Sequence, residues 1–162
     1  MRFGILTLSD RSSRGERADA SGPVLADLIR AESWSVAEQA ILPDEESAIS
    51  AALTEWADSG RFDIILTTGG TGFALRDVTP EATRAVIQRD APGLAEVMRA
   101  ESLKKTPHAM LSRAVAGIRG RTLIVNLPGS PKGALENLQT ILPVLPHAVQ
   151  LLKDDPASES SH

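Results

Sequence analysis

Cysteine is absent from the sequence, and its absence excludes several kinds of chemistry together. Disulfide frameworks, zinc–thiolate sites, iron–sulfur clusters and thiol nucleophiles all require cysteine side chains. The fold must therefore be stable without covalent cross-links. A chain of 162 residues can form one such domain, because a chain near this size buries about 68–70% of its unfolded surface. A chain without cysteine is also compatible with a reducing compartment.

Aromatic residues, positive charge and long apolar runs are scarce as well. Three Phe, two Trp and no Tyr offer little for stacking on nucleic-acid bases, and a formal net charge of −4 gives no basic footprint. No apolar run approaches the roughly 20 residues that span a bilayer, and the first residues do not read as a signal peptide. We therefore expect a cytoplasmic protein that binds neither nucleic acid nor membrane.

What the sequence does contain is an alternation of short apolar runs with stretches of helical periodicity. The expected strands are Phe3–Leu8, Ser35–Leu42, Asp63–Thr67 and Thr122–Leu127. The expected helices begin near Pro23, Asp44, Thr79, Pro92 and Pro131. This alternation predicts an α/β protein, a three-layer α/β/α sandwich around a mostly parallel sheet. The segment Met110–Arg119 can pair with Thr122–Leu127 through a turn, which predicts an antiparallel edge strand.

Local signals set several boundaries in this scheme. The charged stretch Arg11–Ala20 is expected to be a loop. Ser21 or Gly22, then Asp44 and then Thr79 are expected to cap the N-termini of three helices. Pro143 and Pro146 must kink or break the last helix. We expect a single domain over residues 1–152 and a polar, frayed tail over residues 153–162.

Polar or glycine-rich segments follow the expected strands, and this places the site. In sheets of this kind ligands bind beyond the carboxyl ends of the strands. The segments concerned are Ser9–Asp10, Pro43–Asp44, Thr68–Thr79 and Asn126–Pro131. The last of these could give amides and a hydroxyl to a ligand, or could be only a turn and a helix cap.

The glycine-rich segment Thr67–Gly72 directly follows the clearest strand. Its glycines permit positive φ angles, its successive amides can form an anion-binding concavity, and its hydroxyls can donate to phosphate oxygens. It is neither a Walker A motif nor a dinucleotide fingerprint, since Leu75 stands where a third glycine would be required. The sequence leaves two interpretations open: a phosphate-binding loop, or a tight turn without a ligand.

Two acidic residues lie beside these segments. Asp77 could hold Mg²⁺ against bound phosphates, because hard cations prefer oxygen ligands, or could form an Asx-turn ahead of the next helix. Asp44 has the position of a helix cap, so a catalytic role is the less obvious alternative. No Gly-x-Ser-x-Gly elbow or other activated nucleophile is present.

The segments Thr68–Phe73 and Arg76–Thr83 together resemble the signature of the molybdopterin adenylyltransferase family of molybdenum cofactor biosynthesis. Further matching segments are Leu8–Asp10, Asp19 with Ser21–Pro23, Leu42–Glu45, Pro92–Gly93, Glu101–Leu103, Leu111–Arg113 and Asn126–Gly129. The resemblance covers residues 2 to about 152, and it extends to the G domain of plant and animal molybdenum-insertion proteins such as gephyrin. Several spaced motifs in one order are more specific than a glycine loop alone.

This resemblance implies an α/β/α homotrimer that transfers AMP from MgATP to the terminal phosphate of molybdopterin and releases pyrophosphate. It implies Mg²⁺ as cofactor, ATP as co-substrate, and hand-over of the product to a molybdenum-insertion protein. The family's two functional aspartates fall on Asp44 and Asp77, which are expected to be catalytic and to hold Mg²⁺. The residues expected to bind nucleotide or substrate are Ser9, Asp10, Thr68, Gly69, Gly70, Thr71, Gly72, Ser102, Ser112, Pro128, Gly129 and Ser130.

Two other functions remain open at the level of sequence. One is a molybdopterin-binding carrier or scaffold of the same fold without catalysis, since fold does not fix function. The other is an adenylyltransferase that acts on a different phosphorylated metabolite. A related subgroup of the family, whose adenylyltransferase activity is less secure, lacks the Arg-Asp-Val-Thr-Pro pattern. This chain carries the pattern intact, which favours an active enzyme.

Overall fold

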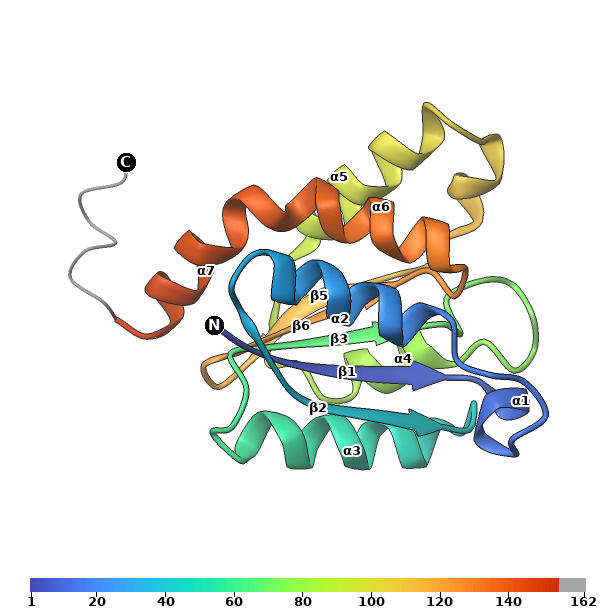
Figure 1. Cartoon of the computed structure of the whole chain (residues 1–162), viewed down its shortest axis with the longest axis horizontal. Helices are drawn as coiled ribbons and strands as arrows, with labels where there is room; N and C mark the ends of the chain where they lie inside the picture. Colours follow the sequence, from blue (N-terminus) through green and yellow to red (C-terminus); the bar gives the residue numbers. More distant parts are fainter. Residues whose placement is uncertain (155–162) are drawn as a thin grey trace.

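A computed structural model describes residues 1–154, and a six-stranded sheet of order β2-β1-β3-β6-β5-β4 forms its centre (Figure 1). The strands are β1 (Arg2–Leu8), β2 (Ser35–Leu42), β3 (Ile64–Thr68), β4 (Arg89–Asp90), β5 (Ala116–Arg119) and β6 (Thr122–Leu127). Strands β2, β1, β3 and β6 run parallel, whereas β5 pairs antiparallel with both β6 and β4. The mostly parallel sheet and its antiparallel edge are confirmed. The two-residue strand β4 was not predicted.

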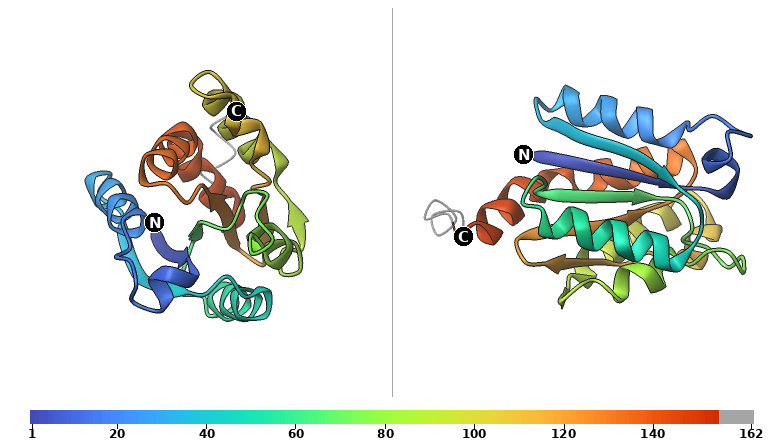
Figure 2. Two further views of the ribbon diagram at one scale, coloured as in Figure 1. Left: turned by 90° about the vertical axis from the view of Figure 1, so that its right-hand side faces the viewer. Right: turned by 90° about the horizontal axis from the view of Figure 1, so that it is seen from below.

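Helices cover both faces of the sheet, which confirms the three-layer sandwich (Figures 1 and 2). The helices are α1 (Asp10–Ser13), α2 (Ser21–Ala31), α3 (Glu46–Asp58), α4 (Thr79–Arg84), α5 (Pro92–Leu103), α6 (Pro131–Ile141) and α7 (Leu145–Leu152). Two 3₁₀ turns add η1 (Pro107–Leu111) and η2 (Leu142–Val144). Core contacts place α2, α5, α6 and α7 on one face and α3 and α4 on the other. The break at Pro143 is confirmed, because η2 separates α6 from α7.

The alternation of side chains along β1 explains why its sequence is mostly apolar. Phe3 and Ile5 belong to the core under α2 and α6, and Leu6 and Leu8 belong to the core under α3. A strand covered on both faces buries both sets of side chains, so its sequence shows no polar face. Each of these side chains is at most 3% exposed, and burial of a side chain of this size contributes about 1.5–3 kcal/mol.

The cap predicted for α2 is wrong in its residue. Ser21 and Gly22 are the first helical residues, and Ala20 is the N-cap without a side-chain hydrogen bond. The carboxylate of Asp19 accepts hydrogen bonds from the amides of Ser21 and Gly22, both at 3.0 Å. Asp19, the residue before the N-cap, therefore accepts the hydrogen bonds that an N-cap side chain would otherwise accept from the first amides of the helix.

The caps predicted for α3 and α4 are also wrong, for a different reason. Glu45 and Val78 occupy the N-cap positions, and neither makes a side-chain cap. The Asp44 side chain instead contacts the loop after β1, and the Thr79 hydroxyl donates to the carbonyl of Gly69 at 2.9 Å. Both side chains bind segments that are distant in sequence. A rule that predicts helix caps from neighbouring residues cannot take such contacts into account.

The segment predicted as a loop over Arg11–Ala20 begins with helical residues. Residues 11–13 belong to α1, whose first turn is capped by Ser9 through a hydrogen bond from the Ser12 amide at 3.2 Å. At the other end, Lys153 and Asp154 form a turn, and residues 155–162 of the predicted tail lie outside the described residues. Over residues 1–154, no helix is both long and apolar enough to cross a membrane.

Asp63, just before β3, gives a first prediction about stability. Its carboxylate is 3% exposed and accepts hydrogen bonds from the Arg2 amide at 2.7 Å and from its guanidinium at 3.0 Å. The Lys153 ammonium lies 2.9 Å away. Burial by itself raises the pKa of Asp63, but these hydrogen bonds outweigh burial and hold the pKa at about 2 instead of 3.8.

We expect Asp63→Asn to lower the free energy of unfolding by about 2 kcal/mol at pH 7, because the ionised carboxylate is favoured in the folded state. This stabilisation is complete above the unfolded pKa of about 3.9 and is lost as the pH falls through the lower folded value. Urea unfolding at pH 7 and near pH 2 measures the gap between wild type and variant. A gap that does not shrink at low pH would contradict the assignment.

Candidate active site

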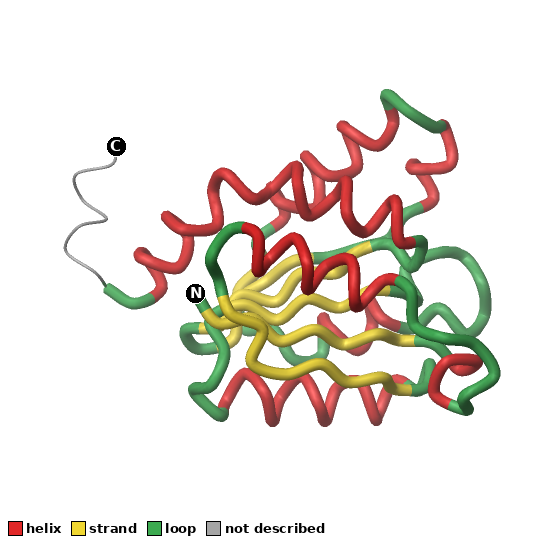
Figure 3. Tube along the Cα trace, viewed as in Figure 1, coloured by secondary structure: helices red, strands yellow, loops and turns green. Residues whose placement is uncertain are grey.

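The carboxyl ends of the four parallel strands open into a cleft of about 760 Å³. Figure 2 (left) looks onto this end of the sheet, and Figure 3 shows the loops that leave it. Its walls come from the segments that follow β1, β2, β3 and β6, as the position of the polar loops predicts. The predicted site residues that line it are Ser9, Asp10, Asp44, Thr68, Gly69, Gly70, Asp77, Gly129 and Ser130.

A second cavity of about 300 Å³ lies between α5, η1 and α6. The predicted site residues that line it are Thr71, Gly72, Ser102, Ser112, Pro128 and Ser130. Ser130 belongs to the walls of both cavities. The structure therefore brings every predicted site residue to one of two neighbouring cavities, although the chain separates the first and last of them by about 120 positions.

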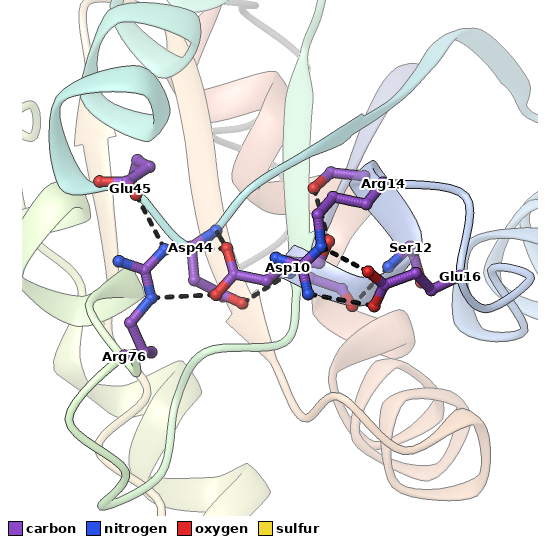
Figure 4. Close-up of polar contacts among 9 residues, drawn as sticks. Asp10, Ser12, Arg14, Glu16, Asp44, Glu45 and Arg76 are labelled. Carbon is purple, nitrogen blue, oxygen red and sulfur yellow. Dashed lines mark hydrogen bonds and ion pairs between the residues drawn. The ribbon is translucent and has the colours of Figure 1, made fainter.

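Asp44 and Asp10 hold each other through a reciprocal pair of hydrogen bonds (Figure 4). The Asp10 amide donates to the Asp44 carboxylate at 2.9 Å, and the Asp44 amide donates to the Asp10 carboxylate at 3.0 Å. Arg76 adds two hydrogen bonds to Asp10, both at 2.9 Å, and one to Glu45 at 2.8 Å. The loop after β3 is thus tied to the loops after β1 and β2.

The two aspartates of this pair differ in their electrostatics. Burial raises the pKa of Asp44, and the negative charges of Asp10 and Asp77 raise it further against the hydrogen bond from the Asp10 amide. Asp10 shows the opposite shift, because its hydrogen bonds to Arg76 lower its pKa. A cation placed beside Asp44 would favour the ionised form of its carboxylate, against the effect of burial.

The glycine loop turns sharply at its first two glycines. Gly69 has φ +105° and Gly70 has φ +64°. A Cβ atom on Gly69 would lie 2.3 Å from the carbonyl oxygen of Leu8, and one on Gly70 would lie 2.3 Å from the Thr79 hydroxyl and 3.2 Å from the Asp44 carboxylate. Only glycine lets the backbone pass this close to the acidic wall of the cleft.

The amides of this loop are not all equivalent. The Gly69 amide donates to the carbonyl of Leu127 at 3.2 Å, so it already has an acceptor within the protein. The amides of Gly70, Thr71 and Gly72 donate to no acceptor among residues 1–154. Three consecutive free amides next to a cleft form a concavity that attracts anions.

The hydroxyl groups near the loop serve mainly to fix the backbone. Thr68 donates to the carbonyl of Pro128 at 2.7 Å, and Ser21 donates to the carbonyl of Gly129 at 2.7 Å. Ser130 accepts a hydrogen bond from the Gly133 amide at 3.1 Å and caps α6. The Thr68 hydroxyl is therefore engaged with the protein in this structure, and its predicted role in binding nucleotide or substrate stays a prediction.

Comparison with known proteins places the chain in a family. A family model described as "Probable molybdopterin binding domain" matches residues 4–147. Molybdopterin adenylyltransferase from Helicobacter pylori (strain J99) is 43% identical over 154 residues, which cover 94% of this chain and 88% of that protein. The chain belongs to the molybdopterin adenylyltransferase family.

Two further similar proteins extend the comparison. The molybdopterin biosynthesis enzyme MoaB from Thermus thermophilus has a crystal structure with a TM-score of 0.89, 54% identity, and coverage of 96% of this chain and 98% of that one. The molybdenum cofactor synthesis protein cinnamon from Drosophila melanogaster is 48% identical over 94% of this chain. The chain spans only about a quarter of the length of cinnamon, 26%.

The acidic residues of this family member fit a magnesium ion held jointly with a phosphorylated ligand. Asp44 and Asp77 each accept one backbone amide, from Asp10 at 2.9 Å and from Ala74 at 3.0 Å, and each keeps a second oxygen without a hydrogen bond inside residues 1–154. Within the same residues, no group of three His, Cys, Asp or Glu side chains could hold a metal alone. Mg²⁺ often binds through one or two carboxylates, phosphates and water, which matches this donor set.

The sequence interpretation missed several residues that shape the site in this member of the molybdopterin adenylyltransferase family. Arg76 joins two acidic loops, and Asp19 satisfies the start of α2 and accepts the Thr7 hydroxyl at 2.7 Å. Arg17 lines the cleft and donates to Ser9 at 3.3 Å. Arg76 and Asp19 stand inside segments that carry the resemblance, which was the signal available for them. Nothing in the sequence pattern marks Arg17.

Proposed function

We propose that this protein is a molybdopterin adenylyltransferase, which transfers AMP from ATP to the terminal phosphate of molybdopterin and releases pyrophosphate. The observation that carries the proposal is that Asp44, Asp77 and Gly70 line one cleft, and that the free amides continue from Gly70 to Thr71 and Gly72 at the neighbouring cavity. Membership of the family and the similarity to named molybdopterin adenylyltransferases support the same reaction and a role in molybdenum cofactor biosynthesis.

The reaction needs no nucleophile from the protein. An oxygen of the terminal phosphate of molybdopterin attacks the α-phosphorus of ATP, the bond from the α-phosphorus to the bridging oxygen breaks, and pyrophosphate leaves with the electron pair. The protein has to position the two phosphates and offset their charge, as in phosphoryl transfer generally. The cleft carries groups for both tasks, namely backbone amides and acidic side chains that suit a divalent ion.

Individual residues take distinct parts in this mechanism. The amides of Gly70, Thr71 and Gly72 donate to phosphate oxygens, and Gly69 gives the loop its turn. Asp44 and Asp77 hold Mg²⁺, which when bound offsets the charge on the phosphates. Asp10 contributes by holding the Asp44 carboxylate through its backbone amide, because its own carboxylate is paired with Arg76.

The two cavities suit the two substrates. The larger cleft, which is lined by Asp44, Asp77 and Gly70, takes the triphosphate of ATP. The smaller cavity has apolar walls at Met98, Leu111 and Ala114 together with the polar groups of Ser102 and Ser112, and this mixture suits a flat heterocycle such as a pterin. Ser130 stands where the two cavities meet, which is where the phosphates must react.

The wider setting of the reaction is part of the same proposal. We expect a homotrimer in the cytoplasm that passes its product to a molybdenum-insertion protein. The C-terminal segment supports an assembly, because Val144 in η2 and Leu151 in α7 are 50% and 47% exposed in the single chain. Exposed apolar side chains of this size are suited to contact with another copy.

The test is release of pyrophosphate by the purified chain with molybdopterin and MgATP. We expect release that requires both substrates and is lost when EDTA removes the divalent ion. Binding of molybdopterin without pyrophosphate release would contradict catalysis and favour the carrier. If other phosphorylated metabolites supported pyrophosphate release equally well, molybdopterin would be contradicted as the specific substrate. ATP without a second substrate is the control, because it must give no pyrophosphate.

A further inference from the structure

The tip of the glycine loop, residues 73–76, has little apolar packing to hold it in place. Phe73 is 69% exposed and Leu75 is fully exposed. Asp77 follows directly. Arg76 ties the tip to Asp10 and Glu45, and contacts at the base of the loop also determine where the Asp77 carboxylate lies in the cleft. The Asp77 amide donates to the carbonyl of Ala74 at 2.9 Å, a contact inside the loop that does not fix the loop to the rest of the fold.

Arg113 supplies contacts to both sides of this tip. Its Nε donates to the carbonyl of Gly72 at 2.8 Å, and its Nη2 donates to the carbonyl of Asp77 at 2.6 Å. Its backbone amide also donates to the carbonyl of Thr71 at 2.8 Å. One side chain thus joins the two ends of the tip, because it binds Gly72 just before the tip and Asp77 just after it.

The orientation of the Arg113 guanidinium is itself fixed by Glu81. Its Nη1 donates to one oxygen of Glu81, and its Nη2 lies 3.4 Å from the other. Glu81 stands in the first turn of α4, which begins two residues after Asp77. A planar guanidinium with several donors in a fixed fork can satisfy two carbonyls and a carboxylate together, whereas a lysine ammonium acts as a single point charge.

We propose that Arg113 is a positioning residue, which sets the carboxylate of Asp77 in the cleft by holding Gly72 and Asp77 together. The inference rests on the proposed function. It goes beyond that function by assigning part of the catalytic geometry to a residue outside the larger cleft. The neighbouring Ser112 lines the smaller cavity, so the segment that carries Arg113 borders that cavity directly and reaches the larger cleft through Asp77.

Steady-state kinetics of Arg113→Gln tests this role. We expect kcat to fall by about 10–100-fold and the KM for ATP to change less than about threefold, because a small displacement of a catalytic group costs rate more than binding. Arg113→Lys should stay at least about tenfold below wild type, since it cannot bridge both carbonyls. If the glutamine variant does not fold, the lysine variant carries the test. A kcat within twofold of wild type would overturn the proposal.

Arg119→Gln is the matched control. Arg119 also forms two hydrogen bonds to one carboxylate, that of Asp58 at 2.9 Å each, and one to a backbone carbonyl, that of Val86 at 3.1 Å. It lines neither cavity. We expect its kcat within twofold of wild type. An equal loss of kcat in both arginine variants would show a purely structural effect and refute positioning.

A double-mutant cycle separates action through Asp77 from an independent effect. If Arg113 acts by positioning the Asp77 carboxylate, Arg113→Gln should slow the reaction little or not at all once Asp77→Asn is present. Losses that multiply in the double variant would refute the proposal.

Amide hydrogen exchange provides a readout that needs no catalysis. The amides of Ala74 and Asp77, both hydrogen-bonded inside the loop, should exchange at least about tenfold faster in Arg113→Gln and at the wild-type rate in Arg119→Gln. Unchanged exchange in Arg113→Gln would refute the positioning role. If wild type itself released no pyrophosphate, the proposed function would fail, and the exchange data would still decide whether Arg113 orders the loop.

Discussion

Asp77→Asn should reduce pyrophosphate release by about 10²–10³-fold while the fold remains intact. The asparagine side chain keeps an oxygen that can accept the hydrogen bond from the Ala74 amide, so the loop keeps its local contact. The substitution removes a negative charge at the wall of the cleft. A divalent ion that binds the phosphates needs this charge as a ligand. The loss should therefore appear in kcat and in the apparent affinity for Mg²⁺.

The measurement is initial-rate kinetics across a magnesium titration, with thermal unfolding of each variant to verify the fold. Asp27→Asn is the matched control, because Asp27 makes only a surface ion pair with Arg30 at 3.6 Å and its side chain is 80% exposed. The control should retain wild-type turnover and the same magnesium dependence. Full activity in Asp77→Asn would remove this residue from the mechanism.

Gly69→Ala should have the largest effect on stability, a loss of about 3–5 kcal/mol in the free energy of unfolding. At φ +105° an alanine is strained, and its Cβ would meet the carbonyl oxygen of Leu8 at 2.3 Å. Both partners of that clash belong to the backbone, so no side chain can rotate away to relieve it. Either β1 or the glycine loop must move, and residues of both line the cleft.

Urea or thermal unfolding measures this loss, and Gly93→Ala is its control. Gly93 lies in the first turn of α5, and a Cβ atom there would have no neighbour within 4 Å. Alanine at a helical position without steric conflict should leave the stability unchanged or raise it by up to about 1 kcal/mol. Equal stability of the two alanine variants would contradict the assignment of strain to Gly69.

The order of layers and the main strands were predictable from the sequence because they depend on local apolar patterns. Ile64–Leu66 form a short apolar run between turn signals, and β3 is found there, shifted by one residue at both ends from the predicted strand. The helix caps were not predictable. Asp44 and Thr79 have the residue types of caps, but contacts with Asp10 and Gly69 compete for their side chains and win.

The position of the site was predictable for a topological reason, whereas its bracing was not. Parallel strands bring their carboxyl ends to one edge, so polar loops after β1, β2, β3 and β6 had to meet there. Arg76 and Arg113 act through partners 30 or more positions away, namely Asp10, Glu45, Gly72 and Asp77. No periodicity or spacing rule selects one such partner among many acids and carbonyls.

Arg2 and Lys153 share the carboxylate of Asp63, so both ends of the described chain emerge together at the amino edge of the sheet. The cleft opens at the carboxyl edge, toward which the arrows of the parallel strands point in Figure 1. Extra polypeptide joined at either of these points would leave the cleft unobstructed. This geometry explains how a unit of this kind can be built into a much longer multidomain protein without rearrangement.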